Sequence, residues 1–402
     1  MPPIVFRKGL DLKDEVAGDL AAAYHSRMVD EIRAAGHVRR AGRLTVHLAR
    51  EFGFCYGVDR AVDYAYQTRR KFPEKRVFLT GEIIHNPHVN DQLRAQGIRI
   101  LTDPGEDRGA LGPDDVVILP AFGVSVGELA RLDRQGCTLV DTTCGSVLNV
   151  WKNVRRYAQD GFTSVIHGKV THEETRATAS QATQYPGGHY LVVRDQEEAD
   201  VACRFIRHGG DPPAFMAALG AGASPGFDPA RHLVRIGCAN QTTMLMSESL
   251  TIGEMFRQAM LDRYGPAGVA ERFRAFDTIC SATQERQDAI LQLLDEQALD
   301  LMVVIGGYNS SNTCNLARLS AERVPTFHIA EPECLVSARE VRYRPIGLPS
   351  TTAVPEMTSK VWLPDGPVTI GLTAGASTPN NTVGQVVERL ERLAAGAPGA
   401  QV

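Results

Sequence analysis

The sequence lacks several features that mark common classes of protein. It contains no CxxC pair, and its eight cysteines follow neither zinc-ribbon nor ferredoxin spacing. It has no apolar run near the roughly 18 residues of a membrane span, and no GxxxxGK[ST] or GxGxxG nucleotide motif. The start, MPPIVFRKGLDLKDEV, holds no apolar signal-peptide core and includes acids that transit peptides avoid. We therefore expect a cytoplasmic protein with reduced cysteines.

The charge of the chain also argues against one class of partner. The 43 basic and 47 acidic side chains give a formal net charge of −4, so nucleic-acid binding has no overall electrostatic support. The hydrophobic fraction of 43% and the charged fraction of 22% are those of an ordinary globular protein. At about 150 residues per domain, the 402 residues predict two or three domains.

Short apolar segments alternate with helical patterns from residue 43 onward. Each segment ends in a polar or glycine turn, which is typical of βαβ units and of parallel sheets covered on both faces. Such sheets bind ligands at the carboxyl ends of their strands, where these turns lie. The sequence therefore predicts an α/β fold with mostly parallel strands near residues 44–49, 76–80, 116–120, 138–141, 164–168, 190–194, 233–237, 302–306 and 368–373.

Three segments differ from this pattern. Within residues 1–42, apolar side chains recur every four residues from Leu12 to Ile32. This predicts one amphipathic helix that ends near Gly36 and docks on the main body rather than on a partner. Residues 203–232 are rich in Gly, Pro and Ala, and we expect a surface insertion with one short helix. We expect the tail after Arg392 to be frayed.

Three cysteines occupy one kind of position. Cys55, Cys144 and Cys280 each lie between a predicted strand and a predicted helix. A helix N-terminus lowers the pKa of a thiol, and thiolates bind soft metal centres. Three thiolates can hold a [4Fe–4S] cluster that keeps one iron open for a substrate, whereas ordinary buried cysteines and a zinc site are alternatives. The other five cysteines lack this full context, and we expect them to serve packing.

Five other turns carry groups that suit an anion. They contain imidazole, ammonium, hydroxyl and amide groups near predicted helix starts, where phosphates bind. Each turn alone is more often a simple helix cap, but together with the cysteine turns they favour one convergent site. Glu174, two residues after His172, is a candidate proton carrier or a helix-start acid. The candidates are His85, His88, His167, Lys169, His172, Thr242, Thr243, Ser310, Ser311, Asn312, Ser377 and Thr378.

Seven motifs of the chain resemble the LytB/IspH family of 4-hydroxy-3-methylbut-2-enyl diphosphate reductases. They are GFCYGVDRAV, GEIIHNPHV, VDTTCGSV, THEET, NQTTM, NSSNT and TAGAST, in family order within residues 43–390. The resemblance implies a trefoil of three small α/β lobes around a central [4Fe–4S] cluster, one per chain. It also implies reduction of (E)-4-hydroxy-3-methylbut-2-enyl diphosphate to isopentenyl and dimethylallyl diphosphate, the last step of the methylerythritol phosphate pathway. A ferredoxin or flavodoxin would supply the electrons.

The functional residues of the family match positions in this chain. Cys55, Cys144 and Cys280 match the three cluster ligands, which leave one iron open. Glu174 matches the acid of a proton path, and Thr242 matches the hydroxyl near the hydroxyl group of the substrate. The positions that match diphosphate-binding residues are His85, His172, Ser310, Asn312 and Ser377, with Thr243 and Ser311 beside such positions.

Two positions depart from the common family pattern. Phe122 stands where many members have a histidine, which leaves the diphosphate site one cation-capable group short. Tyr56 replaces a common alanine after the first cysteine. The AFG motif, the HGK…HEET turn and the N-terminal extension resemble the longer cyanobacterial and plant branch. We hypothesise that Lys169 or His167 replaces the lost charge, because both lie shortly before His172.

The resemblance and the cysteine positions predict five segments. A helical extension at 1–42 precedes three lobes at 43–143, 144–276 and 277–375, and the insertion near 203–232 belongs to the second lobe. The segment 376–402 is expected to return to the active site and the first lobe.

Two functions of other classes stay open at this point. One is a different three-cysteine cluster enzyme, a dehydratase or condensing enzyme of the aconitase or quinolinate synthase kind. The other is a non-catalytic protein that binds a phosphate ligand and has inert cysteines. Neither a nucleic acid nor a membrane is an expected partner.

Overall fold

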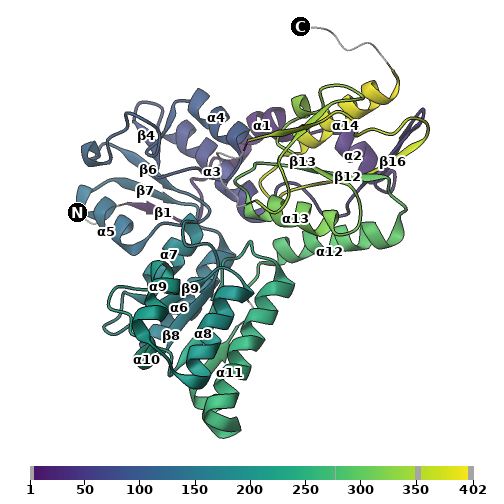
Figure 1. Ribbon diagram of the computed structural model, residues 1–402. Helices are drawn as coiled ribbons and strands as arrows, with labels where there is room; N and C mark the ends of the chain where they lie inside the picture. Colours follow the sequence, from purple (N-terminus) through teal and green to yellow (C-terminus); the bar gives the residue numbers. More distant parts are fainter. Residues whose placement is uncertain (1–3, 277, 349–354, 397–402) are drawn as a thin grey trace. The chain divides into compact units, whose positions relative to one another are not determined.

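The computed structural model describes residues 4–276, 278–348 and 355–396. These residues divide into two compact units. Unit 1 comprises residues 4–7, 75–81, 100–276 and 278–280, and unit 2 comprises residues 8–74, 82–99, 281–348 and 355–396. Three largely parallel sheets organise the chain, which confirms the predicted α/β class (Figure 1). Among the described residues, no helix is long and apolar enough to cross a bilayer.

The first sheet has five strands in the order β1-β7-β6-β4-β5. The pairs β1/β7, β7/β6 and β6/β4 are parallel. Strand β6 has the sequence VVIL and is buried along its length, as expected for a strand covered on both faces. The elements are β1 (Val5–Phe6), β4 (Val77–Leu79), β5 (Ile98–Ile100), β6 (Val116–Leu119), β7 (Thr138–Asp141), the 3₁₀ helix η1 (Arg108–Ala110) and α5 (Val126–Gln135).

The second sheet lies in unit 1 and has four parallel strands in the order β11-β10-β8-β9. Helices α8 and α11 run side by side next to it (Figure 1). Their apolar faces pack on Val165 and Ile236 of the sheet. The elements are α6 (Gly145–Gln159), β8 (Thr163–His167), α7 (Glu173–Ala182), β9 (Tyr190–Val193), α8 (Gln196–His208), β10 (Ile236–Asn240), α11 (Met246–Arg272) and β11 (Phe273–Ala275).

The third sheet lies in unit 2 and has the order β13-β12-β16-β3-β2. All pairs are parallel except β2/β3, and a separate antiparallel ribbon joins β14 and β15. The strands are β2 (Val38–Ala41), β3 (Leu44–Leu48), β12 (Leu301–Ile305), β13 (Thr326–Ile329), β14 (Val341–Tyr343), β15 (Met357–Ser359) and β16 (Val368–Ala374). The helices are α3 (Tyr56–Lys71), α4 (Pro87–Ala95), α12 (Ser281–Glu296), α13 (Ser311–Ala321), η3 (Pro332–Cys334) and α14 (Asn380–Ala394).

The N-terminal extension forms two helices, so the prediction of one continuous helix was wrong. Helix α1 (Lys13–Tyr24) ends at an extended residue, and α2 (Arg27–Ala34) begins after Ser26. The Ser26 hydroxyl accepts the Val29 amide at 3.3 Å, which starts a new helix instead of continuing the first. The docked position is confirmed, because Val29 and Ile32 are buried in the core of the third sheet.

The segment 203–232 also differs from its prediction. It contains the end of α8, helices α9 (Pro212–Leu219) and α10 (Pro229–His232) and the 3₁₀ helix η2 (Gly220–Gly222), not one short helix. Phe215 and Phe227 are buried with α8 and α11. Two aromatic rings in this Gly- and Pro-rich segment bury enough apolar area to attach it to the core.

Two smaller predictions shift at their ends. The strand predicted at 233–237 is β10 and starts at Ile236, because α10 is capped only at Leu233. The tail was expected to fray after Arg392, yet Leu393 and Ala394 are helical and buried, because they pack in the core of the third sheet. The end of that prediction, residues 397–402, lies outside the described residues.

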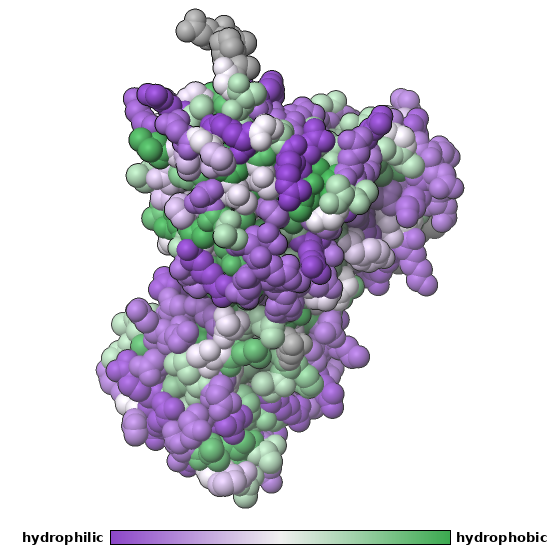
Figure 2. All heavy atoms as spheres, turned by 90° about the vertical axis from the view of Figure 1, so that its right-hand side faces the viewer, coloured by the Kyte–Doolittle hydropathy of each residue, from purple (hydrophilic) through white to green (hydrophobic). Residues whose placement is uncertain are grey.

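The strands of the predicted lobe 43–143 belong to two different sheets. Strand β3, at the start of the predicted lobe 43–143, pairs with β16 and therefore belongs to the sheet that contains β12. The lobe boundaries themselves stay a prediction. Hydrophilic and hydrophobic side chains are interspersed on the face shown in Figure 2, as on most globular proteins.

Candidate functional site

The three cysteines singled out by the sequence all lie at helix starts. Cys55 directly precedes α3, Cys144 precedes α6, and Cys280 precedes α12. Each is partly exposed. A helix start points unpaired backbone N–H groups and the positive end of the dipole at the thiol, an arrangement that favours a thiolate ligand.

Four other cysteines are in a different environment. Burial raises the pKa of the Cys203 thiol to about 12 and also raises the pKa of Cys137, Cys238 and Cys334. These thiols keep their protons and are enclosed by the core. Cys314 is partly exposed. The partly exposed trio at helix starts therefore has the donor chemistry of a soft metal centre, whereas the buried four do not.

Hydrogen bonds connect each cysteine segment to a neighbouring part of the chain. The Cys55 amide donates to the Ala376 carbonyl at 3.2 Å, and the Cys144 amide donates to the Ala121 carbonyl at 3.0 Å. Two residues before Cys280, the Thr278 hydroxyl bonds to the side chain of Asn240 at the end of β10. The amide of Asn240 donates back to the Thr278 oxygen at 3.1 Å.

In unit 1, Glu174 and Thr242 form a buried pair. One carboxylate oxygen of Glu174 accepts the Thr242 amide at 2.6 Å, and the other accepts the Thr242 hydroxyl at 3.0 Å. Glu174 is 1% exposed and lies in the first turn of α7, while Thr242 follows the end of β10. A carboxyl group joined to a hydroxyl can pass a proton to it. The fold thus brings together two of the sequence candidates, 68 residues apart.

His172 caps α7 and is held by its own helix. Its Nδ1 atom accepts the Glu174 amide N–H at 3.2 Å, which leaves the ring proton on Nε2. The Phe122 ring meets His172 edge to face, with centroids 5.6 Å apart. Phe122 therefore packs against a candidate anion ligand instead of supplying a further polar group.

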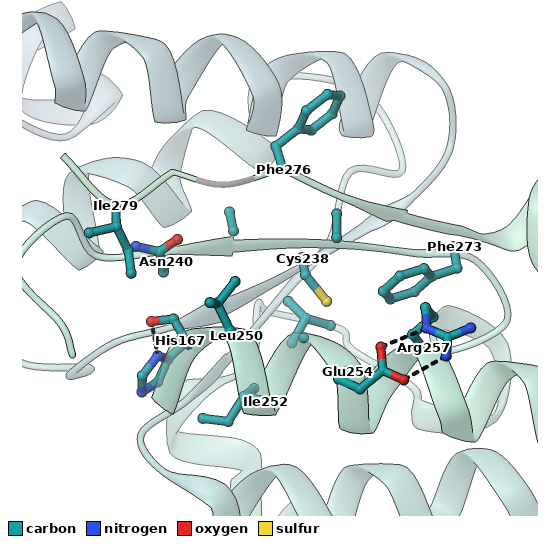
Figure 3. Close-up of a pocket in the computed structure, with 15 residues that line it drawn as sticks. His167, Cys238, Asn240, Leu250, Ile252, Glu254, Arg257, Phe273, Phe276 and Ile279 are labelled. Carbon is teal, nitrogen blue, oxygen red and sulfur yellow. Dashed lines mark hydrogen bonds and ion pairs between the residues drawn. The ribbon is translucent and has the colours of Figure 1, made fainter. Parts of the chain in front are cut away.

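His167 and Lys169 lie in different surroundings. The His167 ring is 2% exposed and bonds through Nδ1 to the Ser249 hydroxyl of α11 at 2.7 Å. It lines a cavity of about 240 Å³ together with Cys238, Ile252 and other mostly apolar residues (Figure 3). The Lys169 amide donates to the Gln241 side chain at 3.2 Å. That side chain in turn donates to the Thr243 hydroxyl at 2.7 Å.

In unit 2, three polar turns are joined to one another. Ser310 caps α13 by accepting the Thr313 amide at 3.3 Å. Asn312 accepts the Ala376 amide at 2.9 Å through its side-chain oxygen, while its buried Nδ2 has no partner among the described residues. The Ser377 hydroxyl donates to the His85 carbonyl at 3.1 Å. The neighbouring Ser311 is 1% exposed, at the first position of α13.

The ring of His85 is held by an acid that the sequence reasoning did not single out. His85 Nδ1 lies 3.1 Å from Glu82 Oε2, and Asn309 Nδ2 donates to the same oxygen at 2.9 Å. A side chain at Gly307 would place its Cβ 2.5 Å from the His85 carbonyl, so only glycine permits this approach. His88, also a candidate, lines a separate open cavity in unit 2 with Arg69 and Arg70.

Comparison with known proteins now decides the family. The model of the family described as "LytB protein" matches residues 46–391. This chain belongs to that family. It is 50% identical to "4-hydroxy-3-methylbut-2-enyl diphosphate reductase" of Gloeobacter violaceus, over 98% of this chain and 95% of the relative. The protein of the same name from Thermosynechococcus vestitus is 47% identical, over 96% and 94%. The predicted resemblance to the longer cyanobacterial branch is confirmed.

Solved structures agree with the family. A structure titled as (E)-4-hydroxy-3-methyl-but-2-enyl diphosphate reductase, "the Terminal Enzyme of the Non-Mevalonate Pathway", is 26% identical. It covers 86% of this chain and 99% of its own, with a TM-score of 0.51. The reductase structure from Plasmodium falciparum, at 20% identity, supports the fold with a TM-score of 0.61 and coverage of 85% and 86%. This LytB chain therefore extends beyond the first of these structures.

Several residues around these turns escaped sequence reasoning. Glu82, Asn309 and Gln241 hold other polar residues in place, and no local pattern distinguishes them from surface residues. Arg286 is 3% exposed in α12. The one signal in the sequence was the position of Arg286 on the apolar face of its helix, because a buried guanidinium needs hydrogen-bond partners.

Proposed function

We propose that this chain reduces (E)-4-hydroxy-3-methylbut-2-enyl diphosphate to isopentenyl diphosphate and dimethylallyl diphosphate, the last step of the methylerythritol phosphate pathway. The reaction takes up two electrons and two protons, breaks the C–O bond of the hydroxyl group and releases water. The geometric observation that supports it best is the buried Glu174–Thr242 pair, a proton source joined to a hydroxyl relay. The reductases most similar in sequence give the substrate class.

Cys55, Cys144 and Cys280 are the proposed ligands of one [4Fe–4S] cluster per chain, with one iron left open. Their partial exposure at three helix starts fits this group, whereas the protonated, buried cysteines do not. When bound, the cluster supplies electrons singly and a Lewis-acidic iron for the leaving oxygen. We propose a ferredoxin or flavodoxin as the electron donor, and a reducing compartment, the cytoplasm, for the reaction.

The diphosphate is proposed to bind the polar side chains that the sequence singled out. The N–H at Nε2 of His172 is a donor for a phosphate oxygen. The N-terminus of α13 adds backbone N–H groups, and the unpartnered Asn312 Nδ2 adds a side-chain donor. The full proposed set is His85, His172, Thr243, Ser310, Ser311, Asn312 and Ser377. Lys169 or His167 is proposed to replace the charge that Phe122 cannot supply.

Glu174 is the proposed acid of the reaction. In the structure the Thr242 hydroxyl donates to Glu174. A protonated Glu174 would reverse this hydrogen bond and pass its proton to the Thr242 oxygen, while the Thr242 hydroxyl proton passes to the leaving hydroxyl of the substrate. The second proton goes to one of two carbons of the allylic skeleton, which accounts for two products. The predicted lobes 43–143, 144–276 and 277–375 and their trefoil arrangement belong to the same proposal.

One experiment tests the proposal. The purified chain is reconstituted without oxygen with iron and sulfide, and then assayed with the diphosphate substrate and a chemical reductant. We expect a brown protein with about four irons per chain and both C5 diphosphates as products. A protein that stays colourless and metal-free, or that binds zinc alone, would contradict the cluster. An iron-loaded protein that reduces no substrate would point to another cluster enzyme.

A further inference from the structure

Arg286 in α12 is a buried cation beside the loop of Cys55. Its side chain is enclosed in unit 2, with 3% of the residue exposed. The guanidinium donates to the Gly53 carbonyl from two nitrogens, at 2.7 and 3.2 Å, and to the Phe54 carbonyl at 3.2 Å. A fourth hydrogen bond goes to the Ala282 carbonyl at 2.8 Å, within α12 itself. The two loop carbonyls belong to the residues directly before Cys55.

These contacts fix the loop from one side, and β16 fixes it from the other. The Gly53 amide donates to the Ala374 carbonyl at 3.2 Å, and the Cys55 amide donates to the Ala376 carbonyl at 3.2 Å. Gly53 has a φ of +75°, and its Cβ would lie 2.8 Å from the Asn380 side chain, so the turn requires glycine. Cys55 therefore cannot shift without breaking bonds to α12 or to the turn after β16.

The charge of Arg286 is satisfied by dipoles and not by an acid. Within the described residues its hydrogen bonds go to carbonyl oxygens, and no carboxylate lies within ion-pair distance. Asp59, in the first turn of α3, is the acid whose pKa the Arg286 charge affects. Burial raises the pKa of this carboxyl, and the Arg286 charge partly opposes the increase. A buried cation without a paired anion is costly, so a nearby anionic group would stabilise it.

We propose that Arg286 is the positioning residue of Cys55 and the fixed counter-charge of the iron–sulfur group that Cys55 holds. This inference rests on the proposed function, because it requires the cluster. A cluster that gains one electron becomes more negative, so a fixed cation nearby stabilises its reduced form. Arg286 thereby makes uptake of an electron from the donor easier, and its hydrogen bonds keep the Cys55 ligand in place.

The experiment compares three full-length variants with the parent chain. Arg286→Gln removes the charge, and Arg286→Lys keeps the charge but cannot bridge two carbonyls. Arg344→Gln is the matched control, because Arg344 is also in unit 2, is 2% exposed and donates to the carbonyls of Pro345 and Leu348. Hydrogen–deuterium exchange of the metal-free proteins reports on the amides of Gly53 and Cys55. Redox titration of the reconstituted proteins, followed by the EPR signal of the reduced cluster, reports on the charge.

For the metal-free proteins we expect exchange at Gly53 and Cys55 to be about tenfold faster or more in both Arg286 variants, since hydrogen bonds to a charged donor are lost. The Arg344 variant should keep the parent rate at these amides. For the reconstituted proteins we expect a lower reduction potential in Arg286→Gln and a nearly unchanged one in Arg286→Lys.

Two results would overturn the inference. One is parent-like exchange and potential in Arg286→Gln, and the other is an equal change of both in Arg344→Gln. A parent chain that binds no cluster would overturn the proposed function, and with it the counter-charge. Faster loop exchange in the metal-free variants would then still establish the positioning contact, so the two failures can be told apart.

Discussion

His172 in unit 1 and His85 in unit 2 are held with opposite hydrogen-bond polarity. Nδ1 of His172 accepts the Glu174 amide N–H, whereas Nδ1 of His85 donates to the Glu82 carboxylate, which can only accept when ionised. Nδ1 of His172 is thus a hydrogen-bond acceptor, and Nδ1 of His85 is a donor. Two histidines in similar motifs are therefore oriented by partners of opposite polarity, a backbone N–H and a carboxylate.

The polar groups around the two histidines differ as well. In unit 1, the two carboxylate oxygens of Glu174 each accept a hydrogen bond from Thr242, one from its amide and one from its hydroxyl. In unit 2, Asn312 keeps a buried amide nitrogen without a partner among the described residues. A buried donor of this kind costs free energy until an acceptor binds. The Glu174–Thr242 pair thus has partners without a ligand, whereas Asn312 has a donor left for one.

The largest effect is expected from the cysteines. Cys144→Ser removes a partly exposed ligand at a helix start and should abolish stable iron binding and all turnover. Cys203→Ser changes a thiol of the same unit that burial keeps protonated, and it should retain the iron content of the parent. Iron and sulfide analysis after reconstitution checks both variants. Equal loss of iron in the two would show that helix-start geometry does not select the ligands.

The proposed proton transfer from Glu174 is tested by Glu174→Gln. The amide keeps the size and one acceptor oxygen for Thr242 but carries no acidic proton, so turnover should fall about 10²–10⁴-fold with little change in KM. Steady-state kinetics with the diphosphate substrate give the two constants. Thr242→Ser keeps a hydroxyl and should retain most of the activity. A Glu174→Gln variant with the turnover of the parent would assign the proton to another group.

The difference in how the two histidines are held is tested by Glu82→Gln. Without the carboxylate, His85 and Asn309 lose the charged acceptor that they share, so the His85 ring is oriented less firmly and the KM for the diphosphate should rise about tenfold. Glu128→Gln is the control, since Glu128 pairs with Arg131 on α5 in unit 1. Binding of the substrate to metal-free protein, measured by calorimetry, separates this effect from turnover. Equal affinity in Glu82→Gln and the parent would show that the Glu82 carboxylate does not position His85 for the substrate.

The smallest effect is expected for the replacement of the charge missing at Phe122. Lys169→Ala should raise the KM a few-fold, about the effect of one partly exposed charge. His167→Ala should change the KM less, because its Nδ1 atom is engaged with Ser249 of α11. Calorimetry of substrate binding to the two metal-free variants shows which residue contributes more to affinity. If neither variant changes substrate affinity, the compensation hypothesis fails for both residues.

Local pattern predicted most strands and the helix-start position of the three cysteines. Strands β6 and β12 are fully buried apolar runs, which sequence alone reveals. The break between α1 and α2 was missed, because the apolar spacing continues across Ser26 while the backbone turns there. One short helix was expected within residues 203–232, and the presence of more than one was missed because Gly and Pro are abundant there.

The sequence by itself determined which residue types follow each strand: thiols at three helix starts, hydroxyls and amides at others, and the acid after His172. Tertiary structure decided which of them meet. Glu174 reaches Thr242 because β8 and β10 are paired and parallel, so the turns after both strands lie at one edge of the sheet. Arg286 reaches Phe54, in the loop of Cys55, across 232 positions of sequence. Hydrophobic periodicity describes one element at a time, whereas such contacts depend on strand order, which long-range packing selects.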